Sequence, residues 1–182
     1  MFQEKVPDEV IKYVEKLLKD HNFGQRGYAD GDYSEQKTGL IGQTLIQDLF
    51  NIPRPDGSEG SDGGVDFIFG SKNIDVKTMG RTVDPKLSYV NNFIGLQKEY
   101  NSDILIFCSL NKNTNILTIC GWISKEDFLK KASFFKSGTK RYRDDGTYFY
   151  TKAELYEIEN SLLNQSNSIQ DLKAGIKKFR VH

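Results

Sequence analysis

Residues that bind zinc or form disulfides are scarce in this sequence. Its 182 residues include two cysteines and two histidines, and these do not have the spacing of a zinc site. Cys108 and Cys120 both lie in apolar runs typical of strands. We therefore expect buried, reduced thiols, as in proteins of the cytoplasm, and neither a zinc site nor a disulfide framework.

Long apolar segments are absent as well. The sequence has no apolar run of about 18 residues and no secretory signal at its N-terminus, so we expect a cytoplasmic protein that does not span a membrane. Charge of one sign is not in excess either, since 25 basic side chains balance 25 acidic ones. A nucleic-acid partner would therefore be met by a local basic patch or with the help of a metal ion.

Hydrophobic periodicity predicts a single α/β domain over residues 1–182, with a mixed β-sheet and flanking helices. Helices are expected over 7–20, 32–50, 91–100, 124–133 and 168–179, and strands over 65–69, 74–78, 87–90, 103–110 and 116–123. Asp32 with Glu35 forms a capping box, and Ser124 caps the later helix. The expected parts are a core at about 32–133, an N-terminal helical extension over 1–31, and a C-terminal basic and aromatic loop with a helix over 134–182.

Three charged side chains interrupt the apolar hairpin predicted over residues 63–78. Asp66 lies in the first strand, and Asp75 and Lys77 lie in the second. Side chains alternate between the two faces of a strand, so Asp75 and Lys77 share a face. A turn at residues 71–72 would place Asp66 opposite Lys77 on that face. Charges in an apolar hairpin are costly unless they pair or bind a ligand.

Two carboxylates on adjacent strands form a hard-oxygen site. Mg²⁺ prefers oxygen ligands and takes one or two protein carboxylates, leaving its other positions to water and substrate phosphate. Asp66 and Asp75 would supply the carboxylates, and the carbonyl of Val76 would supply a further oxygen. Lys77 would lie beside the attacking water, where it can help to deprotonate that water or stabilise developing negative charge. This combination indicates phosphodiester hydrolysis.

Four sequence motifs resemble those of the PD-(D/E)xK nuclease superfamily, and in particular its small phage-type nucleases. They are Gly-Leu-Ile-Gly-Gln at 39–43, Gly-Gly-Val-Asp at 63–66, Asp-Val-Lys-Thr at 75–78 and Gly-Trp-Ile-Ser at 121–124. The resemblance covers roughly residues 35–130. It implies a restriction-endonuclease-like αβββαβ core, with Asp66 and Asp75 as metal ligands and Lys77 as the catalytic lysine. It also implies Mg²⁺ as cofactor, with Mn²⁺ able to replace it, and DNA as partner.

The helix predicted over 32–50 departs from the pattern of these nucleases at one position. The phage-type nucleases carry glutamate where this chain has Gln43. A glutamine can hold a metal through its carbonyl oxygen or orient a water, but it adds no negative charge. Glu35 is the alternative. It lies eight residues earlier and about 80° around the helix, and it already has a capping role. We therefore favour Gln43 as the fourth residue of the site.

Basic and aromatic residues gather in the predicted loop over 134–150. Its cations can contact phosphates, and its aromatic rings can stack on bases. An ordinary solvated loop is the alternative interpretation. The predicted nucleic-acid contacts are Lys136, Lys140, Arg141 and Arg143, with Lys72 and Arg81 at the two ends of the second hairpin strand.

Together these features predict a Mg²⁺-dependent deoxyribonuclease that acts as an endonuclease rather than an exonuclease. A homodimer would explain cleavage of both strands of a duplex. Two alternatives remain open. One is a catalytically impaired nucleic-acid-binding module on the same fold, which the neutral side chain of Gln43 favours. The other is a metal-independent interaction protein.

Overall fold

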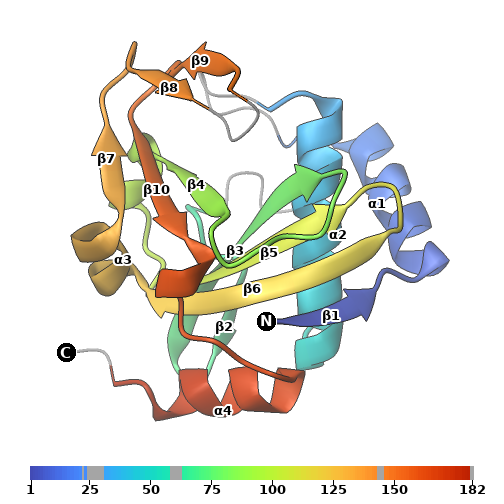
Figure 1. Ribbon diagram of the computed structural model, residues 1–182. Coiled ribbons are helices and arrows are strands. Elements are labelled where there is room, and N and C mark those ends of the chain that lie inside the picture. Colours follow the sequence, from blue (N-terminus) through green and yellow to red (C-terminus); the bar gives the residue numbers. More distant parts are fainter. Residues whose placement is uncertain (22, 24–30, 58–62, 143–145, 181–182) are drawn as a thin grey trace.

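The two longest apolar runs form the middle of the main sheet (Figure 1). They are strands β5 (Ile104–Asn111) and β6 (Ile116–Ser124), and the full strand order is β1-β6-β5-β3-β2. Strand β3 (Lys72–Arg81) pairs parallel with β5, whereas β1 (Phe2–Lys5) and β2 (Phe67–Phe69) pair antiparallel with their neighbours. The computed structural model describes residues 1–21, 23, 31–57, 63–142 and 146–180. Within them the chain is a mixed α/β body with flanking helices, as predicted.

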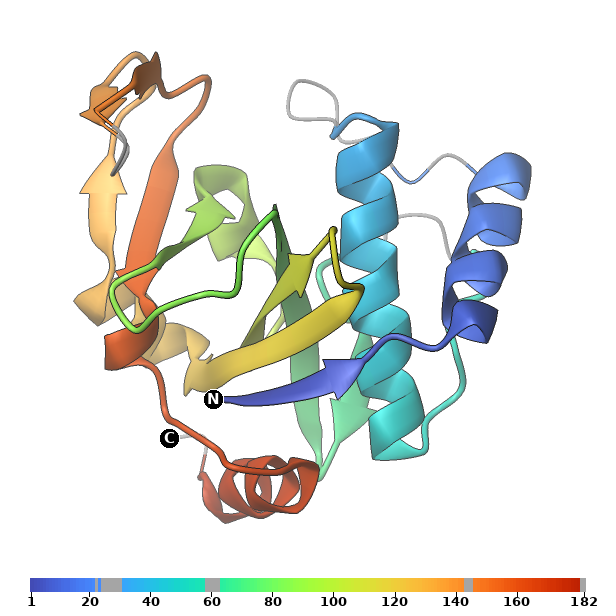
Figure 2. The same ribbon diagram turned by 45° about the vertical axis from the view of Figure 1, so that its right-hand side comes forward.

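Helices α1 (Asp8–Asp20) and α2 (Tyr33–Phe50) cover one face of this sheet, and α4 (Ile169–Lys178) closes the end of that layer (Figures 1 and 2). The apolar stripe of α1 buries Val10, Val14 and Leu17. On the sheet side, alternate residues of β3 and β5 point into the same cluster: Ile74, Val76, Ile104, Ile106 and Cys108. Each fully buried aliphatic side chain contributes about 1.5–3 kcal/mol relative to leaving it exposed.

A second, three-stranded sheet covers the other face. It consists of β4 (Val90–Ile94), β10 (Leu155–Glu159) and β7 (Ser133–Phe135), and it lies beside helix α3 (Lys125–Lys131). Phe93 of β4 stacks on Phe128 of α3 with ring centroids 4.9 Å apart. Leu105 and Phe107 of β5 complete this smaller core. The charged hairpin therefore lies in a sheet that is covered on both sides.

Two strands outside these layers form a hairpin of their own. Strands β8 (Lys140–Tyr142) and β9 (Tyr148–Tyr150) pair antiparallel and project beyond β7 and β10 (Figures 1 and 2). Short 3₁₀ helices lie at Gly95–Glu99 (η1) and Asn160–Leu162 (η2). The described helices are too short or too polar to cross a membrane.

The predicted helix caps are confirmed. Asp32 and Glu35 form a reciprocal capping box at the start of α2, and the Ser124 side chain accepts a hydrogen bond from the backbone N–H of Asp127. Four of the five predicted helices are present, and α3 ends at Lys131, two residues early. Cys108 and Cys120 are buried free thiols, as expected.

Three element predictions are wrong, and one strand was missed. The strand expected over 87–90 is absent apart from Val90, the first residue of β4. Residues 134–150 are not a loop, because most of β7 and all of β8 and β9 lie there. The helix expected over 91–100 is replaced by β4 and η1, since β4 pairs with β10 more than 60 residues later. Strand β1 was not predicted at all. Four alternating residues give too weak a local signal, and β1 exists because it pairs with β6.

Gly42 sets the distance between α2 and the charged hairpin. A Cβ atom at this position would come within 1.9 Å of the Thr78 hydroxyl oxygen on β3. Gly39, one turn earlier, has nothing within 4 Å of such an atom. Gly42 thus serves close packing of the helix against the strand, and this places the glutamines of α2 beside the hairpin.

Candidate functional site

The turn of the hairpin fixes which charged residues face each other. Gly70 and Ser71 have φ angles of +57° and +65°, the left-handed pair expected of a two-residue type I′ turn. The register pairs Phe67 with Ile74 and extends no further. The Asp66 N–H donates to the carbonyl of the same Ile74, so Asp66 lies beside the ladder and not directly opposite Asp75. The prediction that Asp66 lies opposite Lys77 was wrong, because the turn comes one residue earlier than expected. Asp75 and Lys77 share a face of β3, as predicted.

Asp75 and Lys77 form an ion pair inside the molecule. The ammonium of Lys77 lies 2.8 Å from Oδ1 of Asp75, and their side chains are 17% and 2% exposed. Ile74 and Val76 pack under α2, so the alternation of the strand turns Asp75 and Lys77 to the opposite face. There the Lys77 ammonium lies 5.8 Å from the ring centroid of Phe93. The second sheet thus shields the pair from bulk water.

Asp66, the residue before β2, forms hydrogen bonds with the edge of β3. Its backbone N–H donates to the carbonyl of Ile74 at 2.8 Å, and its Oδ2 accepts the backbone N–H of Val76 at 2.6 Å. The N–H and C=O of one strand residue point to the same edge, so the Val76 carbonyl also faces the Asp66 side. The structure therefore brings together Asp66, Asp75, Lys77 and the main chain of Val76.

Helix α2 places against the hairpin a second glutamine that sequence reasoning did not consider. Gln47, one turn after Gln43, is buried and donates its side-chain amide to the Asp66 carbonyl at 3.0 Å. Gln43 is half-buried on the same helix, which covers the face opposite the Asp75–Lys77 pair. Glu35 is occupied at the cap of α2, where Oε2 accepts the N–H of Asp32 at 3.1 Å. Spacing four residues apart on one helix face makes Gln43 and Gln47 hard to separate by sequence.

Lys125 is a residue that sequence reasoning missed. It is the first residue of α3, its backbone N–H donates to the Asp103 carbonyl, and its ammonium donates to the Tyr100 carbonyl. Burial lowers the pKa of Lys125, an effect that the charges of nearby carboxylates, Asp75 first, partly oppose and that of Lys77 reinforces. Lys125 thus lies in the electrostatic reach of the Asp75–Lys77 pair, a position set by tertiary packing that leaves no local sequence signal.

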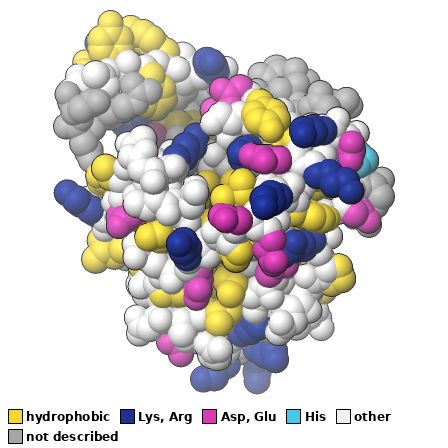
Figure 3. Space-filling model, turned by 90° about the vertical axis from the view of Figure 1, so that its right-hand side faces the viewer, with side chains coloured by type: hydrophobic (Ala, Val, Ile, Leu, Met, Phe, Trp, Pro, Cys, Tyr) yellow, Lys and Arg dark blue, Asp and Glu magenta, His cyan; other side chains and the backbone are white. Residues whose placement is uncertain are grey.

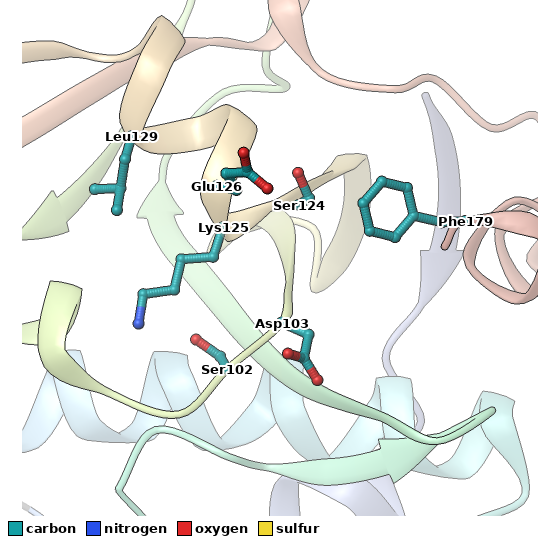
Figure 4. A pocket seen from close by; sticks show the side chains of 7 residues that line it. All are labelled: Ser102, Asp103, Ser124, Lys125, Glu126, Leu129 and Phe179. Carbon is teal, nitrogen blue, oxygen red and sulfur yellow. The ribbon is translucent and has the colours of Figure 1, made fainter. Parts of the chain in front are cut away.

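A pocket of about 340 Å³ opens beside Lys125. Figure 4 shows Lys125 extending past Ser102 and away from Phe179 on the far side of the pocket. The Ser102 hydroxyl is buried and makes no hydrogen bond within the described residues. The pocket also contains the carboxylates of Asp103 and Glu126, so its lining mixes charges of both signs.

The residues at the Asp66 edge suit a hard cation. Within the described part of the chain, no three His, Cys, Asp or Glu side chains are grouped closely enough to hold a metal. Mg²⁺ needs only one or two carboxylates, and the Asp66 carboxylate accepts the N–H of Val76, the residue after Asp75. Oε1 of Gln47 is buried without a hydrogen-bond partner among the described residues, so a further oxygen ligand, or an acceptor for a bound water, lies at the same edge.

The predicted nucleic-acid contacts differ in exposure. Lys136 and Lys140 are exposed, whereas Lys72 is buried at the hairpin turn with little surface for a phosphate. Arg81 donates to the Val90 carbonyl at 2.7 Å, and Arg141 donates to Glu157 at 2.5 Å. Arg143 lies outside the described residues.

The face formed around α1 and α2 carries no field of one sign. Figure 3 shows dark blue Lys and Arg side chains interspersed with magenta Asp and Glu side chains over this face. Some of these side chains form ion pairs around α1 and α2: Lys37 pairs with Glu15 at 2.6 Å, and Arg54 pairs with Asp48 at 2.7 Å. The exposed lysines around the β8–β9 hairpin are therefore better placed for a polyanion than this face.

Comparison with known proteins gives no identification. No family model matches the chain, and neither the curated proteins nor the solved structures contain a significant match. The conclusions about function therefore depend on the residues of the hairpin and on the packing around them.

Proposed function

We propose that this protein is a Mg²⁺-dependent deoxyribonuclease with a PD-(D/E)xK-type site, acting as an endonuclease. The single observation that carries the proposal is that Lys77 lies 2.8 Å from Asp75 while the Asp66 carboxylate accepts the N–H of Val76, the residue between them. The same proposal assigns the chain to a restriction-endonuclease-like core, with α2 as its first helix and β2, β3 and β5 as its first three strands. A homodimer for double-strand cleavage is part of the proposal and is tested by sedimentation.

Asp66, Asp75 and the Val76 carbonyl would hold the metal, with Gln47 rather than Gln43 as the helix residue at the site. When bound, Mg²⁺ supplies Lewis acidity at the phosphate and lowers the pKa of its bound water. Hydrolysis forms a P–O bond from water and breaks the P–O bond to the leaving sugar oxygen, which takes up a proton. The chain's own residues position and stabilise this change.

Lys77 supplies positive charge where the phosphate gains negative charge. Asp75 holds the Lys77 ammonium in place, and Phe93 covers it on the other side, so little reorganisation is needed during the reaction. A fixed charge in a site shielded from water is worth more than the same charge in bulk solvent. Lys125 adds a second positive charge on the same side of the sheet.

Asp66→Asn is the sharpest test. Asparagine can still accept the Val76 N–H through its side-chain oxygen, so the fold is retained while the negative charge is lost. We expect wild-type protein to cleave plasmid and single-stranded circular DNA in Mg²⁺ or Mn²⁺ but not in EDTA, and the variant to cleave neither. The control is Glu126→Gln, which removes an exposed carboxylate that pairs with Lys130 on the surface of α3. Undiminished cleavage by Asp66→Asn would overturn the proposal.

Metal binding can be measured independently of cleavage, through the unfolding temperature. A ligand that binds only the folded state raises stability by about 2.7 kcal/mol at a hundred times its Kd. Mg²⁺ should therefore raise the unfolding temperature of the wild type and of Glu126→Gln, but not that of Asp66→Asn.

The second candidate is a catalytically impaired nucleic-acid-binding module on the same fold. The neutral glutamines of α2 and the 1% exposure of Asp75 favour it, because both limit access and charge for a metal. Salt-sensitive DNA binding without nicking of plasmid in Mg²⁺ or Mn²⁺ would support this alternative. Absence of both DNA binding and a metal-dependent stability change would instead support a metal-independent interaction protein.

A further inference from the structure

The outer face of the β8–β9 hairpin is a cluster of exposed rings. The register pairs Tyr142 with Tyr148 and Lys140 with Tyr150, so these four side chains share one face of the ribbon. Tyr142, Tyr148 and Tyr150 are 64%, 55% and 58% exposed. Single exposed aromatic residues are common on protein surfaces, whereas contiguous exposed apolar surface marks a binding site. We call these four residues the tyrosine face.

The rings of the tyrosine face are close neighbours but are not stacked face to face. The ring centroids of Tyr142 and Tyr148 are 6.2 Å apart and tilted by 60°, and those of Tyr148 and Tyr150 are 5.9 Å apart and nearly perpendicular. The Lys140 ammonium lies over Tyr148 at 4.0 Å and over Tyr142 at 5.0 Å from the ring centroids. A cation therefore lies within the aromatic cluster.

The inner face of the hairpin fixes its orientation on the body. Arg141 donates to the nearly buried carboxylate of Glu157 on β10 at 2.5 Å and lies 3.8 Å from the ring centroid of Phe135 on β7. Because Arg141 is used internally, the tyrosine face is turned outward by an anchored side chain.

The hairpin is attached to the sheet that covers the candidate metal site. Tyr156 of β10 contacts Phe93 with ring centroids 6.4 Å apart, and Phe93 covers Lys77. The tyrosine face and the Asp66 edge are therefore parts of one packed body. A nucleic-acid strand bound by the tyrosine face would be held at a fixed position relative to the site.

We infer that the tyrosine face is a stacking platform for a single-stranded segment of the nucleic-acid substrate. Rings next to a lysine match a ligand that has both exposed π-faces and phosphates. The bases of a single strand are free to stack on aromatic side chains, whereas those of a duplex are stacked on each other. Exposed Lys136 and Lys152 flank the hairpin and add positive charge for the backbone. That the partner is a nucleic acid rests on the proposed function, whereas the preference for single strands rests on the tyrosine face.

The test is a binding experiment in EDTA, so that cleavage plays no part. The probe is a fluorescent single strand of about 12 nucleotides, within the site sizes of such platforms. Two matched probes accompany it: an oligomer of the same length whose sugars carry no bases, and a duplex. Tyr148→Ala should weaken binding of the single strand about 5- to 150-fold, the equivalent of one lost stacking interaction. Tyr148→Phe should bind within about twofold of wild type, because a phenyl ring also stacks on bases.

Two controls separate stacking from charge and from surface change. Tyr33→Ala removes a tyrosine that is 55% exposed at the start of α2, and it should leave binding unchanged. Lys140→Ala should reduce the salt dependence, with a slope smaller by about 0.7, whereas Tyr148→Ala should leave the slope unchanged. The abasic oligomer should bind wild type and Tyr148→Ala equally. Circular dichroism confirms that each variant is folded.

The outcomes distinguish this inference from the proposed function. Equal binding of the single strand by wild type and Tyr148→Ala, or binding of the duplex as tightly as the single strand, overturns the platform even if the protein cleaves DNA. Ring-dependent binding in a protein that cleaves nothing supports the platform and counts against the nuclease. Tyrosine-dependent self-association without binding of any oligomer identifies a protein contact and overturns the inference.

Discussion

The carboxylate of Asp75 is almost fully buried and lies 2.8 Å from the ammonium of Lys77, two residues farther along the same strand. Residues so spaced share a face of the strand, so both members of the pair come from one strand. Breaking a buried pair is costlier than breaking a surface pair, because the remaining charge is left without its counterion in a shielded site.

Lys77→Met should therefore lower the free energy of unfolding by about 3–5 kcal/mol. The double variant Asp75→Asn with Lys77→Met should recover part of this loss, because it removes both charges. The matched control is Lys98→Met, since Lys98 pairs with Glu99 at 3.9 Å on the surface, where such pairs contribute about 0–1 kcal/mol. Urea unfolding measures all three. A loss below about 1 kcal/mol for Lys77→Met would contradict the shielded pair.

Gly42→Ala and Gly39→Ala should change stability in opposite directions. The added methyl group at 42 meets the side chain of Thr78, and overpacking of this kind costs about 1–3 kcal/mol. At 39 the methyl group meets nothing, so the higher helix propensity of alanine should stabilise by up to about 1 kcal/mol. Thermal unfolding of the two variants decides the matter. If both are stabilised, the close approach of α2 to β3 is wrong.

Gln47→Leu should weaken Mg²⁺ binding about 10- to 100-fold, the range seen when a residue that orients a metal ligand is removed. Gln43→Leu, one helical turn earlier, should change it less than about twofold, because the hydrogen bond to the Asp66 carbonyl comes from Gln47. The measurement is the rise in unfolding temperature across a Mg²⁺ titration. The reverse result, with Gln43→Leu weakening the response and Gln47→Leu leaving it intact, would restore Gln43 as the helix residue of the site.

Alkaline pH should destabilise the protein through its two thiols. Burial raises the pKa of Cys108 well above its usual value and that of Cys120 from 9.0 to about 12. Below pH 9 both thiols are protonated in the folded and unfolded states and contribute no pH dependence. Above pH 9 only the unfolded thiols ionise, so each should lower the free energy of unfolding by about 1.4 kcal/mol per pH unit until the pH reaches its folded pKa.

The double variant Cys108→Ala with Cys120→Ala isolates this effect from other alkaline titrations. Its free energy of unfolding, measured with urea, should fall less steeply than that of the wild type between about pH 9 and pH 12. Equal slopes for the two proteins would contradict the burial of the thiols. A thiol reagent provides a second check, since both cysteines should react only after unfolding.

Sequence reasoning identified the elements whose signals are local. The capping box of Asp32 and Glu35 and the continuous apolar run of β5 depend on residues near one another in the chain, and both are confirmed. The placement of Asp75 and Lys77 on one face followed from alternation alone. The predicted register of the hairpin was off by two, because Gly70 and Ser71 form the turn and Lys72 already belongs to β3.

What the sequence could not reveal depends on contacts between distant segments. Lys125 reaches the Asp75–Lys77 pair only because α3 packs behind β5 and β6. Which glutamine of α2 lies beside Asp66 depends on how the helix packs along the hairpin, and Gln47 is the one that bonds the Asp66 carbonyl. The strands β7, β8 and β9 were not predicted, because the segment is rich in basic residues and lysine is depleted in strands.

The pairing of β1 with β6 has a consequence for how the chain folds as it is made. Strand β1 is synthesised before β6, and its Gln3 side chain donates to Thr118, 115 residues later. The ribosome must therefore release the residues between them before one edge of the main sheet can close. Until then the apolar side of β1 has no partner, and pairings so far apart in sequence slow folding. Folding of the completed sheet should accordingly be late and cooperative, with β1 docking after β5 and β6 have paired.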